Sequence, residues 1–385
     1  MPFTNQTEEK QIERAVLVGL SCPSFNTDQD ADERTMDELR ALAETAGAEA
    51  VAMTLQRRPA PDARTFIGEG KAEEVKQLAE MNDASLILFD NELSPSQMSN
   101  LEELTGRTVL DRSALILDIF AQHAVSRAGK LQVELAQLRY TQPRLVGKNR
   151  AMDRLMGGIG GRGPGETKLE TDRRKSRERM ARIRKELDQL RRQRAFTRAR
   201  RSRQGIPLAA LVGYTNAGKS TLLNTLTRSE VLAENKLFAT LDPTTRRLRF
   251  PAEREIILAD TVGFIRNLPK ELTDAFRATL EELEAADLLV HVADASHPDL
   301  LQQITAVETI LADMELDRVP RLLVLNKWDQ LAVPARAELA DAFPLALPIS
   351  AKSGDGLAPL LERLETDLLI RTGPPVIADL PFSLN

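Results

Sequence analysis

The stretch Leu208-Ala-Ala-Leu-Val-Gly213-Tyr-Thr-Asn-Ala-Gly218-Lys219-Ser220 decides the fold of this chain. Its first five residues are apolar and predict a buried strand, and residues 221–227 continue with the pattern of a helix. Between strand and helix the chain matches G-x-x-x-x-G-K-S/T, in which glycines let backbone N–H groups approach phosphate oxygens at a helix start. This order predicts a phosphate-binding loop within an α/β domain.

Two side chains of this loop have defined tasks when a nucleotide is bound. Lys219 would reach the β- and γ-phosphates, and the hydroxyl of Ser220 would hold Mg²⁺. The alternative is a glycine-rich turn that only caps a helix. A chance match to the whole pattern is rare, roughly one in a hundred chains of this length given average residue frequencies.

Three further motifs follow apolar runs or strands. Asp260-Thr-Val-Gly263 offers a carboxylate that suits an outer partner of Mg²⁺, and an N–H of Gly263 that can meet the γ-phosphate. In Asn326-Lys-Trp-Asp329, the last carboxylate can accept hydrogen bonds from N1 and N2 of guanine. Ser350-Ala-Lys352 can supply a backbone N–H to guanine O6. Because open α/β sheets bind ligands at the carboxyl ends of their strands, these motifs predict one guanine-nucleotide site.

The chain divides into four predicted parts. Residues 206–371 contain the phosphate-binding loop and a doubly wound sheet, with buried strands expected at 208–212, 255–259, 288–292 and 321–325. Residues 1–123 alternate short apolar runs with amphipathic ones and predict a small α/β domain with a largely parallel sheet. Its strands are expected at 15–20, 48–55, 85–89 and 108–110, and its helices at 30–46, 71–81, from Ser94 onward and at 113–123. Residues 372–385 form a short tail.

Residues 124–205 predict a long helical hairpin. Apolar residues lie on one helical face of each arm, at Leu131, Leu135 and Leu138, and at Met180, Ile183, Leu187 and Leu190. The glycine-rich residues 157–165 would form the tip, and the second arm, 166–203, would be about 55 Å long at about 1.5 Å per residue.

The charge of the chain is strongly asymmetric. The net charge is −5, but residues 162–203 contain 17 Lys and Arg against 6 Asp and Glu, a net of +11 that leaves −16 for the rest. A solvated face would interleave both signs, whereas Arg191, Arg192, Arg194, Arg198, Arg200, Arg201 and Arg203 follow one another without an acid. This density favours neutralising RNA phosphates, and Arg162 between glycines could enter a narrow RNA cavity.

Composition excludes several other classes of protein. Apolar residues make up 42% and charged residues 28% of 385 residues, so the chain is neither disordered nor fibrous. No apolar run approaches the roughly 20 residues of a membrane-spanning helix. Cys22 is the only cysteine, and His123, His291 and His297 are too scattered for a zinc cluster. These features indicate a soluble cytoplasmic protein. His291 lies within a predicted buried strand and would be a core residue whose hydrogen bonds are satisfied.

The motifs together resemble those of translation-factor-like P-loop GTPases, and within them the HflX-type ribosome-associated GTPases. The likeness extends over nearly the whole chain and includes Phe238-Ala-Thr-Leu-Asp-Pro-Thr244. It implies a GTP hydrolase that binds the large ribosomal subunit near its peptidyl-transferase region and splits or rescues ribosomes under stress. It also implies that Thr240 senses the γ-phosphate and binds Mg²⁺, with Thr244 and Thr245 as alternatives. Many relatives carry a further small carboxyl-terminal domain, for which only about a dozen residues remain here.

The resemblance and the motifs define the predicted site. The catalytic residues would be Lys219, Thr240 and Gly263, and the metal ligands Ser220 and Thr240. The nucleotide-binding residues would be Gly213, Tyr214, Thr215, Asn216, Ala217, Gly218, Lys219, Ser220, Thr221, Phe238, Ala239, Thr240, Leu241, Asp242, Asp260, Thr261, Val262, Gly263, Asn326, Lys327, Trp328, Asp329, Ser350, Ala351 and Lys352.

Two positions bear on the rate of hydrolysis. Ras-type enzymes place a water-orienting glutamine where this chain has Phe264, so unaided turnover is expected to be slow and stimulated by ribosomes. The alternative role of Phe264 is structural, with its ring packed beneath the switch loop. Asn216 resembles the asparagine of GTPases that use K⁺ near the phosphates, or else it tolerates a left-handed turn. Relatives can also admit ATP.

Two other functions remain open at this point. A GTP-controlled assembly factor or RNA chaperone would act on ribosome precursors rather than on mature ribosomes. A tRNA-modifying GTPase would need a site for substrate chemistry, and no catalytic cysteine or cofactor motif is visible for one.

Overall fold

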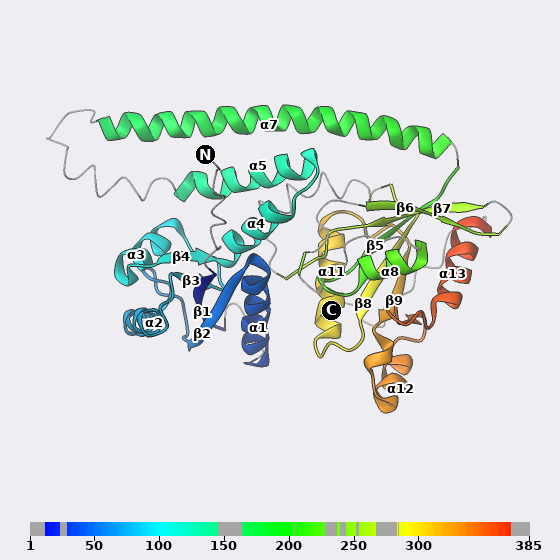
Figure 1. Ribbon diagram of the computed structural model, residues 1–385, viewed down its shortest axis with the longest axis horizontal. Coiled ribbons are helices and arrows are strands. Elements are labelled where there is room, and N and C mark those ends of the chain that lie inside the picture. Colours follow the sequence, from blue (N-terminus) through cyan, green and yellow to red (C-terminus); the bar gives the residue numbers. More distant parts are fainter. Residues whose placement is uncertain are drawn as a thin grey trace, which may run out of the picture. The chain divides into compact units, whose positions relative to one another are not determined.

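The computed structural model describes residues 12–23, 29–144, 164–203, 205–227, 237–238, 244–251, 254–266, 283 and 285–370, with side chains except at 29–32, 164–169 and 194–203. The chain forms two compact units. The first combines Met1–Gln122 with Gln137–Arg179, and the second combines His123–Ala136 with Met180–Asn385. Each unit has its own β-sheet (Figure 1).

The first sheet has four parallel strands in the order β2-β1-β3-β4. They are β1 (Glu13–Ser21), β2 (Ala48–Arg57), β3 (Leu86–Phe89) and β4 (Thr108–Asp111). Helices alternate with them in the chain: α1 (Gln29–Ala46), α2 (Glu69–Met81), α3 (Pro95–Thr105) and α4 (Arg112–His123). The predicted small α/β architecture with a parallel sheet is therefore confirmed.

Both faces of this sheet are covered. Val16, Val18 and Ile87 pack on one face with Val75 and Ala79 of α2. On the other face α1 lies close to β1, since a Cβ at Gly19 would fall 2.6 Å from the sulfur of Met36. Burial on both faces explains why β3 and the middle of β1 are apolar.

The start of α3 follows its sequence signal. Ser94 accepts a hydrogen bond from the backbone N–H of Gln97 (3.2 Å), whose side chain accepts one from the N–H of Ser94 (3.0 Å). Pro95 occupies the first turn, where a missing N–H has no consequence. This reciprocal capping fixes the helix start where Ser94-Pro95 predicts it.

Buried charges gather at the carboxyl ends of β3 and β4. Asp111 is fully buried and accepts hydrogen bonds from the hydroxyl of Tyr140 (2.8 Å) and the guanidinium of Arg144 (3.3 Å). Next to it in the chain, Arg112 is 3% exposed and forms ion pairs with Asp90 and Glu38. The contacts of Asp111 attach the end of α5 (Arg127–Arg144) to β4.

The stretch of chain that follows the first sheet and precedes the second in the sequence is helical where it is described. α5 is followed by α7 (Pro164–Arg203), a helix of 40 residues, and no strand occurs in residues 124–144 or 164–203. Within the second unit, Arg127 of α5 forms an ion pair with Glu186 of α7 (2.8 Å). Met180 and Ile183 are buried, as their predicted position on the seam requires. The tip residues 157–163 lie outside the described part of the chain.

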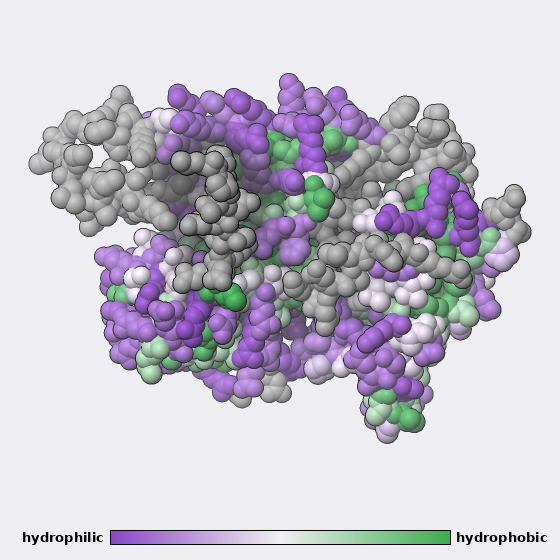
Figure 2. Space-filling model, in the orientation of Figure 1, coloured by the Kyte–Doolittle hydropathy of each residue, from purple (hydrophilic) through white to green (hydrophobic). Residues whose placement is uncertain are grey.

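Most exposed charged side chains of α7 are basic. Exposed basic side chains follow the helix at Arg174, Lys175, Arg177, Arg179, Arg182, Arg184, Lys185, Arg191 and Arg192. Figure 2 shows this hydrophilic surface along α7. The structure does not describe the side chains of the further arginines predicted to contact RNA, namely Arg162, Arg194, Arg198, Arg200, Arg201 and Arg203.

The second sheet has six strands in the order β10-β9-β8-β5-β7-β6. All neighbours are parallel except β6 and β7. The strands are β5 (Leu208–Val212), β6 (Thr244–Arg249), β7 (Glu255–Asp260), β8 (Leu288–Asp294), β9 (Arg321–Asn326) and β10 (Leu347–Pro348). The helices are α8 (Lys219–Thr227), α11 (Leu300–Asp313), α12 (Val333–Ala342) and α13 (Leu357–Glu365), with short helical turns at Trp328–Gln330 and Thr366–Ile370.

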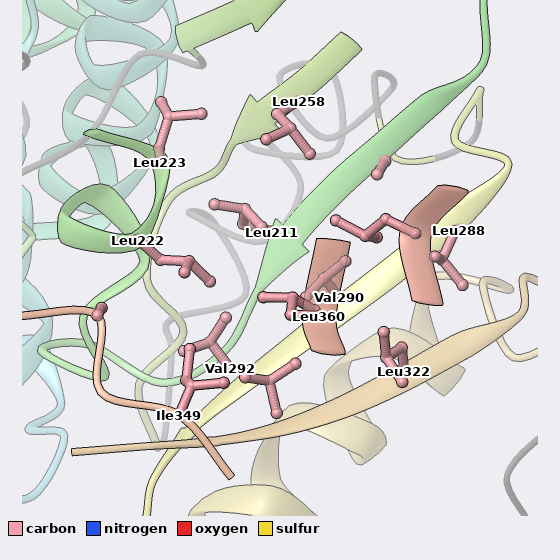
Figure 3. Close-up of a cluster of buried hydrophobic side chains, with 14 of the residues drawn as sticks. Leu211, Leu222, Leu223, Leu258, Leu288, Val290, Val292, Leu322, Ile349 and Leu360 are labelled. Atoms are coloured by element: carbon pink, nitrogen blue, oxygen red, sulfur yellow. The ribbon is translucent and has the colours of Figure 1, made fainter. Parts of the chain in front are cut away.

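Helices cover both faces of this sheet, as in a doubly wound fold. Leu211, Val290 and Leu322 pack on one face with Leu222 of α8 and Leu360 of α13, and Figure 3 shows these side chains gathered there. On the other face, Ala293, Leu323 and Leu325 pack with Leu300 and Ile304 of α11. Because successive residues of β9 serve opposite faces, the strand is apolar throughout, which is how the sequence predicts it.

No helix in the described part of the chain is long and apolar enough to cross a membrane.

Candidate guanine-nucleotide site

The phosphate-binding loop connects β5 to α8 and is packed tightly against the neighbouring strand. Gly213 has φ +149°, and a Cβ there would fall 2.1 Å from the carbonyl oxygen of Val292 on β8. No other residue fits without moving one of the two strands. The loop is thereby fixed at the carboxyl end of the sheet, where α/β folds bind ligands.

Lys219 is held over this loop. It is 6% exposed, and its ammonium group donates to the carbonyl oxygens of Gly213 (3.0 Å) and Tyr214 (2.8 Å). Burial lowers the pKa of Lys219 to about 8, although the nearby carboxylate of Asp260 acts in the opposite direction. A bound phosphate would favour the charged form of this amine, because opposite charges stabilise each other most in a desolvated site.

Ser220 and Asp260 lie together beside the loop. The hydroxyl of Ser220 donates to Oδ2 of Asp260 (2.6 Å), and Asp260 is fully buried at the end of β7. A hydroxyl and a carboxylate are the hard oxygen groups that Mg²⁺ prefers, so this pair fits the ion. Ser220 would hold it directly and Asp260 would support that contact. Bound Mg²⁺ would neutralise charge on the phosphates.

Asn326 connects the phosphate-binding loop to the loop that contains Ala351. Its side-chain amide donates to the carbonyl oxygen of Ala217 in the loop (2.8 Å) and accepts from the backbone N–H of Ala351 (2.9 Å). Asn326 is 2% exposed, and Gly218 lies against its side chain. Thr225 of α8 also donates to the carbonyl oxygen of Ala351 (2.8 Å). The structure therefore brings the predicted phosphate and base motifs together.

The remaining residues of the motif 326–329 follow Asn326 directly in the chain. Lys327 adopts a left-handed conformation, and its amine pairs with Asp294 at the end of β8 (2.6 Å). The side chain of Trp328 packs against the apolar cluster on the α11 face. The backbone N–H of Trp328 donates to the carbonyl oxygen of Ile349 (3.1 Å). Asp329 is exposed, as a group that recognises a base must be before binding.

The loop that follows β10 is ordered by hydrogen bonds of its own. Ser350 is 1% exposed, and its hydroxyl accepts from the N–H of Ser353 (3.1 Å). Lys352 is exposed beside it. This arrangement presents the backbone near Ala351 on the same side of the sheet as Asn326.

Residues after β7 run against the phosphate-binding loop. Thr261 donates from its hydroxyl to the carbonyl oxygen of Leu211 (2.7 Å), and Val262 is buried. The ring of Phe264, at the position of the missing glutamine, is 3% exposed. It is thus enclosed by the protein.

Asn216 occupies the exposed turn of the loop with φ +61°. Asparagine tolerates this left-handed conformation better than most residues, which agrees with the simpler of its two predicted roles. Thr221 follows in the first turn of α8.

The predicted switch residues are described only in part. Ala239, Thr240, Leu241 and Asp242 lie outside the described residues. Phe238 is buried with φ +58°. Thr244 begins β6, where it pairs with Asp260 in the antiparallel ladder, and Thr245 is the next residue of that strand.

His291 takes no part in the chemistry of the site. It is 2% exposed on β8, and its Nδ1 lies 3.2 Å from the carboxylate of Glu308. Burial, together with the charges of Arg321 and Lys219, lowers the pKa of His291 to about 3. The ring is therefore neutral, a satisfied core residue as the sequence predicts.

Several contacts that support the site are not visible in the motifs, although Tyr214 and Lys327 themselves belong to them. Asp294 holds Lys327, the hydroxyl of Tyr214 accepts from the N–H of Arg266 (2.9 Å), and Arg266 pairs with Asp299 (3.0 Å). Each contact joins residues that lie far apart in sequence, so the motifs predict Tyr214 and Lys327 but not the partners Asp294, Arg266 and Asp299. Among these partners, only Asp294 comes shortly after a predicted buried strand.

Comparison with known proteins identifies the family. Three family models match in succession: GTP-binding GTPase N-terminal over residues 33–121, GTP-binding GTPase Middle Region over 123–201, and 50S ribosome-binding GTPase over 208–327. GTPase HflX of Caldanaerobacter subterraneus subsp. tengcongensis is 48% identical over 361 residues, which cover 94% of this chain and 82% of the relative. The chain belongs to the HflX family.

A second HflX relative agrees. GTPase HflX of Escherichia coli is 46% identical over 354 residues, covering 91% of this chain and 82% of the relative. Among solved structures, a GTP-binding protein from the archaeon Sulfolobus solfataricus in complex with GDP is 26% identical, with a TM-score of 0.47, covering 93% of this chain and 99% of that one. As an HflX-family member, this chain is a P-loop GTPase, a hydrolase that acts on GTP.

Proposed function

We propose that this HflX-family chain binds the large ribosomal subunit in its GTP state, splits or rescues stalled ribosomes, and leaves after hydrolysis. The observation that carries the proposal is the row of exposed basic side chains on α7, on a chain that also holds the guanine-nucleotide site. A helix whose exposed charged side chains are mostly basic suits the phosphates of RNA. The match of residues 208–327 to the 50S ribosome-binding GTPase model supports the same partner.

The nucleotide roles form part of this proposal. Lys219 would bind the β- and γ-phosphates, Gly263 would meet the γ-phosphate, and Thr240 would join Ser220 at Mg²⁺. Asp329 and Ala351 would recognise guanine. The comparisons give no support for ATP, so the proposal is restricted to guanine nucleotides.

Slow unaided hydrolysis is the second part of the proposal. Phe264 cannot orient water by hydrogen bonding, and its ring is buried. Ribosomes, or K⁺ bound near the exposed Asn216, would complete the site. A side-chain amide oxygen is a suitable ligand type for such a cation, and equal hydrolysis rates in K⁺ and Na⁺ buffers would exclude it.

The predicted domains and location complete the proposal. We place the boundaries at 1–123, 124–205, 206–371 and 372–385, with the hairpin as the RNA-binding part. Because ribosomes are the partner, the protein would act in the cytoplasm.

The decisive experiment is co-sedimentation with ribosomes in the presence of GTP, GDP or a non-hydrolysable GTP analogue. We expect binding to require GTP or the analogue and to be lost in Asp329→Asn. Splitting would convert intact ribosomes into subunits, whereas an assembly factor would accompany only immature particles. Pelleting that does not depend on the nucleotide would contradict the proposal.

A matched pair of variants tests the basic helix. Replacing Arg174, Arg177 and Arg184 by Gln should abolish pelleting while GTP hydrolysis without ribosomes is unchanged. Replacing Arg40, Arg57 and Arg64, three exposed arginines of the first unit, removes the same charge elsewhere and should leave pelleting largely intact. Equal losses in both variants would show only a nonspecific effect of charge.

A further inference from the structure

The segment after Gly263 is bound to the phosphate-binding loop by its own backbone. The N–H of Phe264 donates to the carbonyl oxygen of Gly213 (3.1 Å), and the N–H of Thr215 donates to the carbonyl oxygen of Phe264 (2.8 Å). These two bonds form an isolated parallel bridge between Tyr214 and Phe264. Any residues could make them, since they use only main-chain groups.

Tyr214 adds a contact that depends on its side chain. It is 4% exposed, and its hydroxyl accepts from the backbone N–H of Arg266 (2.9 Å). The residue at the centre of the bridge thus reaches two residues beyond Phe264. Phenylalanine at position 214 would keep the ring and remove the hydroxyl that makes this contact.

Arg266 is also held through its side chain. Its guanidinium pairs with Asp299 (3.0 Å), whose side chain is 3% exposed. Asp299 stands at the start of α11 but makes no capping hydrogen bond to that helix. The Arg266 side chain is 25% exposed, so the pair is only partly buried. Since desolvating the Asp299 carboxylate offsets much of the attraction, the pair adds little net stability, and positioning is the better explanation for it.

Gly263 connects these contacts to the phosphate-binding loop. A Cβ at Gly263 would lie 2.9 Å from the Cα of Thr215 and 3.1 Å from the amine of Lys219. Gly263 therefore lies directly against the lysine of the phosphate-binding loop. Whatever fixes residues 264–266 also fixes the backbone of Gly263.

We propose that Tyr214, together with the Arg266–Asp299 pair, positions the segment from Gly263 to Arg266 for GTP hydrolysis. Tyr214 holds the backbone of Arg266 and Asp299 holds its side chain. The segment is thereby aligned before the γ-phosphate reacts. Tyr214 is a positioning residue, and its hydroxyl acts on the rate through Gly263 rather than on nucleotide affinity.

The test is single-turnover GTP hydrolysis by the full-length chain carrying Tyr214→Phe, at saturating GTP. We expect the rate to fall about fivefold, which equals about 1 kcal/mol. Affinity for N-methylanthraniloyl-GDP, followed by energy transfer from Trp328, the single tryptophan, should change less than twofold. Asp299→Asn should slow hydrolysis similarly, and the double variant should lose less than the product of the two effects, because both act through Arg266.

Tyr140→Phe is the matched control. Tyr140 is the only other tyrosine, it is buried, and its hydroxyl donates to Asp111 (2.8 Å) in the first unit. That change should lower the unfolding midpoint and leave hydrolysis unchanged. An unaltered or faster rate in Tyr214→Phe, or an equal loss of GDP affinity, would overturn the proposal.

Discussion

Replacing Asn326 by Ala tests how the two ends of the nucleotide site are joined. The side chain makes two buried hydrogen bonds, to the carbonyl oxygen of Ala217 and from the N–H of Ala351. Each contributes about 1 kcal/mol, and each leaves a buried polar partner behind when it is lost. We expect the nucleotide to bind about 2 kcal/mol more weakly, which is about thirtyfold in the dissociation constant.

The assay is titration with fluorescent GDP beside thermal unfolding with and without GDP. Thr225→Val is the matched control, since Thr225 contacts the carbonyl oxygen of the same Ala351 from an exposed position. That variant should lose less than threefold in affinity. If Asn326→Ala bound GDP within threefold of the wild type while its unfolding midpoint fell, Asn326 would support the fold and not organise the site.

Three further predictions concern charge and metal. The neutral His291 has a pKa of about 3 in the fold and about 6.5 when unfolded. The stability that neutral His291 contributes is therefore fully present above pH 6.5 and is lost as the pH falls toward 3. By pH 5 the unfolding free energy of the wild type should have dropped by about 2 kcal/mol more than that of His291→Gln, and parallel losses would contradict this. Arg112→Met leaves two carboxylates buried and should lower the unfolding free energy by about 3–5 kcal/mol, whereas breaking the exposed Arg127–Glu186 pair with Arg127→Met should lower it by less than about 1 kcal/mol in the same denaturant titration. Ser220→Ala should make GDP binding nearly insensitive to removal of Mg²⁺ by chelator, while a wild-type response would exclude Ser220 as its ligand.

Much of the fold follows from local patterns. The strand at 208–212 has the predicted bounds, and β9 extends the predicted 321–325 by one residue. Their residues are apolar on both faces because helices cover both. The helix from Pro95 begins where its cap predicts it.

The edge strand β6 could not be predicted in this way. Residues 244–249 are Thr-Thr-Arg-Arg-Leu-Arg, and only Leu248 is buried. Its strand conformation comes from pairing with β7, which is a contact between segments and not a property of either one. A polar edge also discourages pairing with other chains.

The site shows the same division. The motifs predict Lys219, Ser220 and Asp260, because their chemistry is tied to a local loop or strand end. The contacts that align these motifs, such as the Arg266–Asp299 pair, depend on the packing of distant elements. Sequence patterns therefore predict the reacting groups better than the groups that orient them.

The close approach of Gly213 to Val292 also makes the core part of the binding apparatus. Since only 2.1 Å would separate a Cβ at Gly213 from that carbonyl oxygen, β5 and β8 have no room for independent adjustment. A bulkier side chain introduced between the sheet and its helices would shift one strand and carry the loop with it. Variation in the hydrophobic interior, far from any phosphate, could in this way tune how long a nucleotide stays bound.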